Sequence, residues 1–207
     1  MKGRVIVIGG GAAGLMAAGC ASRRGLDVII YDKNTRPGRK LMITGKGRCN
    51  LTNNCDIQTL IANIVHGGKF LYSAFSAFDT SDTMVFFEKL GVPLKTERGR
   101  RVFPQSDRAA DIVDALKRFT DKSGAAYKNS EISDIIINDR AVKGVITSAG
   151  EKIYADAVIV CTGGLSYPGT GSTGDGYKFA RTAGHGVTGL TPPHVPRVIR
   201  EGPCRKL

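Results

Sequence analysis

The stretch RVIVIGGGAAGLMAAG (residues 4–19) decides the fold of this chain. After Arg4 it is continuously apolar through residue 8, as expected of a strand buried on both faces of a parallel sheet. Glycines then follow at the spacing Gly9-x-Gly11-x-x-Gly14, and residues 12–24 carry small and apolar side chains at helical spacing. The pattern predicts a strand, a tight glycine turn and a helix that begins at the turn.

The three glycines of this turn have different expected tasks. Gly9 allows the tight turn, Gly11 lets a pyrophosphate approach the backbone, and Gly14 lets the helix pack closely on the strand. The first helical residues, Ala12 and Ala13, offer free N–H groups and the positive end of the helix dipole to the phosphates. The stretch therefore predicts a dinucleotide-binding site.

An acidic residue follows the second predicted strand. Residues 28–31 are apolar and lead to Asp32, which lies 18 residues after Gly14. An acid at this place is expected to hydrogen-bond the adenosine ribose and disfavours a ribose 2′-phosphate, so NADP is not expected here. NAD and FAD both remain compatible with these residues.

The middle of the chain changes character twice. Residues 33–55 show no periodicity and are interpreted as a long functional loop. Helical spacing predicts helices over 57–64 and 69–90, and the short arginine-rich stretch 94–103 is predicted to form a β-hairpin or an extended arm. The second of these helices is expected to pack through an apolar face that consists of Phe75, Phe78, Phe86, Phe87 and Leu90.

The rest of the chain is predicted to contain two helices and several short strands. A helix is predicted over 109–119, with Ser106 as its N-cap and Asp107 in its first turn. A buried strand at 157–161 ends in Thr162-Gly163-Gly164, and a last helix is predicted over 176–183. Between these helices, turn residues separate short strands of a small antiparallel meander at 125–127, 132–137, 142–147 and 152–154.

The predicted fold class is therefore α/β. We expect a Rossmann-like FAD/NAD(P)-binding domain over residues 1–190, with a parallel sheet, helices on both of its faces and the antiparallel β-meander at about 125–155. Residues 191–207 carry four prolines and end on Arg205-Lys206-Leu207. They are interpreted as the truncated start of a missing substrate domain.

Composition narrows the class of protein. Of 207 residues, 42% are hydrophobic and 23% charged, which is typical of a globular domain. No apolar run reaches the length of a membrane span or of a signal-peptide core, so we expect a cytoplasmic protein with no membrane partner. Five cysteines without a CxxC pair predict neither a disulfide framework nor a metal site. The net charge of +12 fits a polyanionic cofactor or a nucleic acid, but no nucleic-acid-binding signature is present.

Two features favour FAD over NAD as the dinucleotide. The glycine motif lies at the extreme N-terminus with a meander inserted much later, and a second glycine motif at Thr162-Gly163-Gly164 ends a later strand. This layout resembles the two-motif FAD enzymes of the glutathione reductase and fumarate reductase superfamilies. The string RPGRKLMITGKGRCNLTNN (36–54) is similar to the signature of a bacterial flavoprotein family described as aminoacetone oxidases or bile-acid-pathway dehydro-steroid reductases. Residues 163–177 and Ala183-Gly184-His185 resemble the same family.

The resemblance implies a role for individual residues. The turn glycines would face the FAD pyrophosphate and Asp32 the adenosine ribose, while the backbone at Ile132 would meet the adenine. Arg39 and Lys40 would flank the phosphates, and Asp175 would lie near the far glycine loop. Thr162 and Gly163 would close over the cofactor, and Lys33 and Gly164 complete the expected binding set. The flavin end would be lined by Thr44, Gly45, Arg48, Cys49 and Asn50.

The resemblance also implies a function. Members of that family are about twice as long, so this chain is expected to be the FAD-binding half of a flavin-dependent oxidoreductase that transfers hydride to or from a small organic substrate. NAD(P)H is left open as a diffusible electron donor, and the catalytic acid and base are not assigned. Cys49 is either a thiol near the flavin or a packed, inert cysteine. Two other readings stay open: a flavin-dependent tRNA-modifying enzyme, and an inactive FAD-binding fragment.

Overall fold

A four-stranded parallel sheet forms the centre of the fold. The computed structural model describes residues 2–190. The sheet has the order β10-β1-β2-β6, built from β1 (Arg4–Ile8), β2 (Asp27–Asp32), β6 (Ala126–Asn129) and β10 (Ala157–Val160). The predicted first strand, glycine turn and helix are confirmed, with α1 spanning Ala12–Arg23.

Helices cover one face of the sheet. Alternate residues of β1, Val5 and Val7, belong to the apolar core that also holds Leu15 of α1 and Leu116 of α6 (Ala109–Lys122). The two helices pack so closely that a Cβ at Gly19 would overlap the Phe119 ring. Glycine is therefore required there by packing, since any side chain would push the helices apart.

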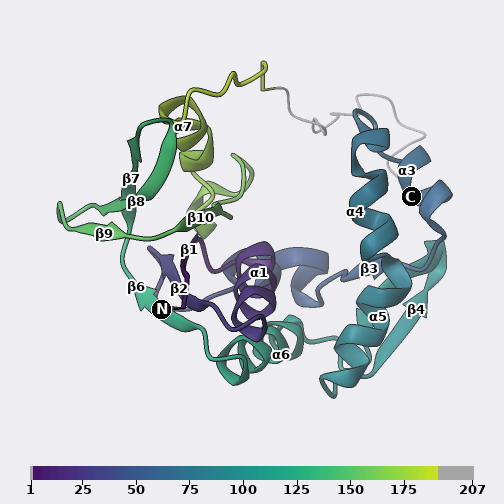
Figure 1. Cartoon of the computed structure of the whole chain (residues 1–207). Helices are drawn as coiled ribbons and strands as arrows, with labels where there is room; N and C mark the ends of the chain where they lie inside the picture. Colours follow the sequence, from purple (N-terminus) through teal and green to yellow (C-terminus); the bar gives the residue numbers. More distant parts are fainter. Residues whose placement is uncertain (1, 191–207) are drawn as a thin grey trace.

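The opposite face is covered mainly by the antiparallel meander. Ile6 and Ile8 of β1 pack with Val145 and Phe179, which belong to β8 (Ala141–Thr147) and α7 (Asp175–Thr182). The meander is three-stranded, in the order β7-β8-β9, with β7 at Ile132–Asn138 and β9 at Lys152–Tyr154. Figure 1 shows α1 and α6 on the far side of the sheet from this meander.

These observations correct two expectations. The strand predicted at 125–127 was expected in the meander, yet residues 126–129 form β6, which pairs in parallel with β2 from Ile29↔Ala126 to Asp32↔Asn129. The sheet was also expected to carry helices on both faces, but the meander takes most of the second face, with α7 beside it. Short apolar strands do not show in sequence which partner they pair with, because the partner is distant in the chain.

A second group of elements lies apart from the parallel sheet (Figure 1). It contains a small antiparallel sheet of order β3-β5-β4, which includes the predicted hairpin of β4 (Leu94–Glu97) and β5 (Arg101–Pro104). The predicted helix over 69–90 is broken into the 3₁₀ turn Gly68–Leu71, α4 (Tyr72–Ala77) and α5 (Thr80–Lys89). The group is completed by β3 (Thr52–Asn53), α3 (Ile57–Ala62) and the 3₁₀ turn Arg98–Arg100.

Local expectations for this region need correction as well. The supposed loop 33–55 contains α2 (Arg39–Ile43), the 3₁₀ turn Thr44–Gly47 and β3. Asp79 is the N-cap of α5 and forms a reciprocal capping box with Asp82. A new helix therefore begins at this point, which interrupts the long helix predicted over 69–90. The N-cap of α6 is Arg108, while Ser106 donates its hydroxyl to Asp111 at 2.5 Å. Of the proposed aromatic face, Phe87 is buried but Phe78 is exposed.

Among residues 2–190, no helix is long and apolar enough to cross a membrane.

Candidate functional site

A cavity of about 600 Å³ opens at the carboxyl ends of β1, β2 and β10. Ligands of open α/β sheets bind at this edge, outside the carboxyl ends of the strands. Its walls come from the first glycine turn, the end of β2, α2, the start of β7 and the second glycine segment. The predicted site residues among its lining are Gly9, Gly11, Ala12, Ala13, Asp32, Lys33, Arg39, Lys40, Thr44, Ile132, Thr162, Gly163 and Asp175.

The three glycines of the first turn differ in what surrounds them. Gly9 has φ +103°, and a Cβ there would lie 2.5 Å from the carbonyl oxygen of Cys161. A Cβ at Gly14 would overlap the carbonyl oxygen of Gly9. At Gly11, by contrast, φ is −78° and a Cβ would meet no atom within 4 Å. The fold therefore requires glycine at 9 and 14, whereas at Gly11 a side chain would only occupy the cavity.

The N-terminus of α1 faces this open space. Its N-cap is Gly11, no side chain caps it, and its first turn carries no acidic residue. Ala12 and Ala13 line the cavity. The N–H groups of a first helical turn have no partners within the helix, so they and the helix dipole favour an anionic ligand group here.

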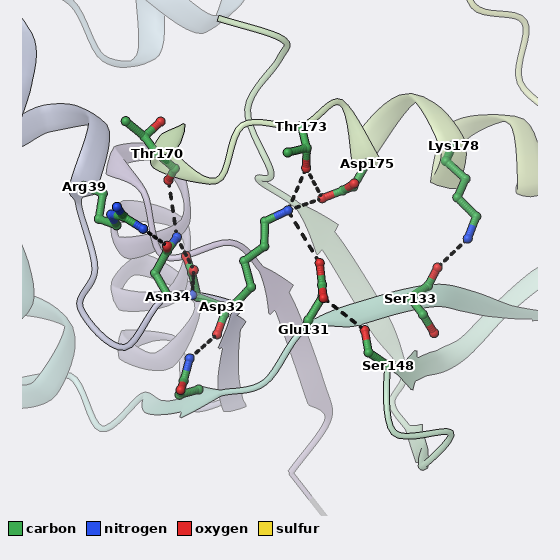
Figure 2. Close-up of polar contacts among 12 residues, drawn as sticks. Asp32, Asn34, Arg39, Glu131, Ser133, Ser148, Thr170, Thr173, Asp175 and Lys178 are labelled. Carbon is green, nitrogen blue, oxygen red and sulfur yellow. Dashed lines mark hydrogen bonds and ion pairs between the residues drawn. The ribbon is translucent and has the colours of Figure 1, made fainter. Parts of the chain in front are cut away.

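Asp32 holds the glycine turn in place. Its Oδ2 accepts the Gly10 N–H at 2.5 Å. Its Oδ1 accepts the backbone and side-chain N–H groups of Asn34 at 2.7 and 2.9 Å, and Figure 2 shows Asp32 beside Asn34. A carboxylate offers about four acceptor positions, so room remains for one donor such as a ribose hydroxyl.

Two residues that the sequence did not single out support the turn after Asp32: Asn34, which lines the cavity, and Tyr127, which lies behind it. Asn34 accepts a bond from Arg39 at 2.7 Å through its side-chain oxygen, and its carbonyl accepts the Tyr127 hydroxyl at 2.8 Å. Burial, and then the charge of Asp32, raise the pKa of Tyr127. An asparagine two residues after the strand-end acid was the available signal for Asn34, because Asn and Asp side chains favour short-range hydrogen bonds in turns.

An ion-pair cluster crosses the cavity rim. The Lys33 ammonium donates to Thr173 Oγ1 at 2.6 Å and to Asp175 Oδ2 at 2.8 Å, and lies 3.6 Å from Glu131 Oε1. Burial would raise the pKa of Asp175, but the hydrogen bonds from Lys33 and Thr173 outweigh it and lower that pKa. The carboxylate therefore stays charged and keeps Lys33 engaged.

The second glycine segment contributes an unsatisfied group. Thr162 Oγ1 is buried and has no hydrogen-bond partner among the described residues. A buried hydroxyl without a partner is costly in a folded protein unless a ligand or water completes it. Together with the space over Gly11, this orphaned atom fits a cavity built to receive a polar ligand.

Six predicted residues lie outside the cavity lining: Gly14, Gly45, Arg48, Cys49, Asn50 and Gly164. Arg48 binds both carboxylate oxygens of Glu97 at 2.9 Å, contacts Asp107 at 3.1 Å, and stacks 4.0 Å from the Phe103 ring centroid. Its side chain thus points to the β4–β5 hairpin, contrary to the expectation that it faces a flavin.

Cys49 and Asn50, which directly follow Arg48, also lie outside the cavity lining. The Cys49 side chain is 1% exposed within the apolar core, and burial raises the pKa of its thiol. The Asn50 amide donates to the carbonyl oxygens of Thr52 and Val102. The packed, inert alternative for Cys49 agrees with this burial, and contact of the segment's backbone with a flavin stays a prediction.

No group of three or more His, Cys, Asp or Glu residues that could hold a metal ion occurs within residues 2–190.

Comparison with known proteins gives several curated relatives. The chain is 32% identical to the 3-dehydro-bile acid delta(4,6)-reductase of Clostridium scindens, over 98% of this chain and 49% of the relative. It is also 32% identical to the ribosomal RNA dihydrouridine synthase of Haemophilus influenzae, over 95% of this chain and 49% of the relative. The chain thus spans about half the length of the curated relatives it matches.

Solved structures confirm the fold. The 3-ketosteroid-delta4-(5alpha)-dehydrogenase of Rhodococcus jostii RHA1 aligns with a TM-score of 0.62 at 15% identity, over 80% of this chain and 47% of that one. Residues 3–195 match the family described as the HI0933-like protein Rossmann domain. The family relationship predicted from residues 36–54 and 163–177 is thereby confirmed: the chain belongs to the HI0933-like Rossmann-domain family.

Proposed function

We propose that this chain is the FAD-binding half of a flavin-dependent oxidoreductase. The observation that carries the proposal is the meeting of both glycine segments at one cavity, where Gly11 leaves open space and the buried Thr162 hydroxyl lacks a partner. Both sides of the cavity thus fit a ligand that is long, anionic and rich in hydrogen-bonding groups. The reductase and dehydrogenase names of the similar proteins support redox chemistry.

The residues would divide the cofactor among them. The pyrophosphate would lie against the N–H groups of Gly11, Ala12 and Ala13, with Arg39 and Lys40 on the cavity wall supplying positive charge. Asp32 would accept a ribose hydroxyl while it continues to anchor Gly10. Bound FAD would supply hydride transfer, and the protein would contribute position and electrostatics.

The substrate proposal is a small organic molecule that is reduced at a carbon–carbon double bond, with NAD(P)H as the diffusible electron donor. Support comes from the relatives, whose names describe a delta(4,6)-reductase and a synthase of dihydrouridine. Both names describe products that have gained hydrogen.

A second candidate is modification of RNA. The ribosomal RNA dihydrouridine synthases of H. influenzae and Escherichia coli are 32% and 30% identical to this chain, and its net charge of +12 suits a polyanionic partner. RNA binding that weakens steeply with added salt would favour this candidate over the small-molecule one. Absence of RNA binding at low salt would remove it.

The test of FAD binding is spectroscopic. The purified chain is titrated with FAD, and we expect quenching of flavin fluorescence that saturates at one flavin per chain and an absorption band that travels with the protein on gel filtration. FMN lacks the adenosine that Asp32 would contact, so it should bind much more weakly. Equal binding of FMN and FAD, or no binding of either, would contradict the proposal.

A further inference from the structure

Lys33 and Asn34, which directly follow β2, form hydrogen bonds to a segment far along the chain. Lys33 donates to Thr173 and Asp175, which are 140 and 142 residues away. Asn34 donates to the carbonyl oxygen of Thr170, 136 residues away, at 3.3 Å. Figure 2 shows Thr170 above Asn34, and Thr173, Asp175 and Glu131 converging on one ammonium. We refer to residues 170–175 as the return segment.

The return segment forms part of the cavity wall. Thr170, Gly171, Ser172 and Asp175 are among the lining residues, opposite the first glycine turn. Its removal would therefore open the cavity from the side of α7. A cofactor held between the two glycine segments would lie against the return segment in this position.

The return segment has little of its own to hold it there. Backbone φ is +101° at Gly171 and +85° at Gly174, and just before it Tyr167 has φ +55°, which is uncommon for a non-glycine residue. The Leu165 and Tyr167 side chains that precede the segment are 53% and 67% exposed, and the one buried side chain within it, that of Ser172, is polar, so apolar packing contributes little here. Segments with few buried apolar contacts open locally at low cost unless other bonds restrain them.

The Lys33 contacts can supply that restraint. The side chains of Lys33 and Asp175 are 27% and 34% exposed, so their ion pair is less screened than one on the open surface. Charge-assisted hydrogen bonds of this kind are short and stronger than neutral ones. Asn34 adds a second attachment, which itself is fixed by Asp32 and Arg39.

We propose that Lys33 and Asn34 are positioning residues that hold the return segment closed over the cofactor cavity, so that release of this segment sets the rate of cofactor exchange. The identity of the cofactor as FAD rests on the proposed function. The closure itself rests only on contacts within the chain.

The first test measures FAD dissociation. Lys33→Met keeps the aliphatic stem and removes the ammonium, and Lys178→Met is the matched control. Lys178 lies on α7, donates to the Ser133 carbonyl at 2.7 Å and lies 3.8 Å from Asp134 Oδ2. It is not among the cavity-lining residues, and its charge acts on Asp175 without a hydrogen bond to it. We expect Lys33→Met to release FAD about tenfold faster or more, the scale of one lost charge-assisted hydrogen bond. Lys178→Met should release it at the wild-type rate, and Lys33→Arg should retain most of the closure.

A double variant tests whether the two partners act together. If the Lys33–Asp175 contact restrains the segment, Lys33→Met combined with Asp175→Asn should accelerate release no more than the stronger single variant. Effects of the two changes that multiply fully would contradict the ion pair as the restraint.

The second test needs no flavin. Chymotrypsin can cleave after Leu165, just before the return segment, and this bond should be cut several times faster in Lys33→Met than in wild type or Lys178→Met. A chain that binds no FAD but shows this difference would refute the proposed function while it supports the closure. If Lys33→Met keeps its melting temperature and is cleaved at the wild-type rate, the closure is wrong. If it is cleaved faster but releases FAD at the wild-type rate, the return segment closes but does not control cofactor exchange.

Discussion

The glycine turn offers the sharpest test, because its three glycines serve different purposes in the structure. A Cβ at Gly11 would point into open cavity with nothing within 4 Å, at a φ of −78° that any residue adopts. A Cβ at Gly14 would overlap the Gly9 carbonyl oxygen. Gly11→Val should therefore fold and lose the cofactor, whereas Gly14→Ala should lose both.

For Gly11→Val, two opposing effects set the expected change in the free energy of unfolding, and two lost interactions set the expected change in FAD affinity. Valine is a poorer N-cap than glycine by up to about 1 kcal/mol, while the loss of glycine's freedom in the unfolded chain returns about 0.4–1 kcal/mol. The free energy of unfolding should thus change by less than about 1 kcal/mol. Displacement of the pyrophosphate forfeits part of the helix-terminus interaction and at least one charge-assisted hydrogen bond, together about 3 kcal/mol. FAD affinity should fall about 100-fold or more.

The assay pairs thermal melting with FAD titration on the same preparations. Wild type and Gly11→Val should melt within a few degrees of each other, and only wild type should bind FAD at low concentrations. Gly11→Ala, with a smaller side chain, should lie between them in affinity. If Gly11→Val binds FAD as wild type does, the pyrophosphate does not lie over this turn, and our assignment of the cavity is wrong.

Three further outcomes are expected. Asp32→Ala removes the acceptor of three hydrogen bonds and should weaken FAD binding by about 1–3 kcal/mol in titrations, with Asp32→Asn intermediate; unchanged affinity would contradict the anchoring role. The hydrogen bond from Arg48 lowers the pKa of Glu97 in the folded protein. The Arg48–Glu97 contact therefore stabilises the fold at neutral pH, and this stabilisation is lost as the pH falls through the lowered pKa. Arg48→Met should accordingly lower the melting temperature at pH 7, with a gap to wild type that narrows below about pH 4 in melting curves, and a gap independent of pH would refute this. Iodoacetamide should label Cys55 well before Cys49, whose burial raises the pKa of its thiol, and mass spectrometry that finds Cys49 labelled first in the native protein would contradict its packed state.

Sequence alone determined the elements whose information is local. The apolar run from Val5 to Ile8 can only be a buried strand, and the glycine spacing after it fixes how the chain turns into α1. Asp32 could be placed at the end of β2 because strand and acid are adjacent in the chain. These features depend on contacts between near neighbours, so residue type and spacing carry them.

Tertiary structure alone decided everything that depends on a distant partner. Residues 126–129 join β2 in the parallel sheet. The meander that follows them packs on the second face of the sheet, where it buries the apolar side chains of Ile6 and Ile8. Arg48 turns away from the cavity because Glu97, 49 residues later, offers it two carboxylate oxygens. The return segment reaches Lys33 and Asn34 across some 140 residues. A side chain's chemistry states what it can bind, but the fold decides which of several suitable partners it meets.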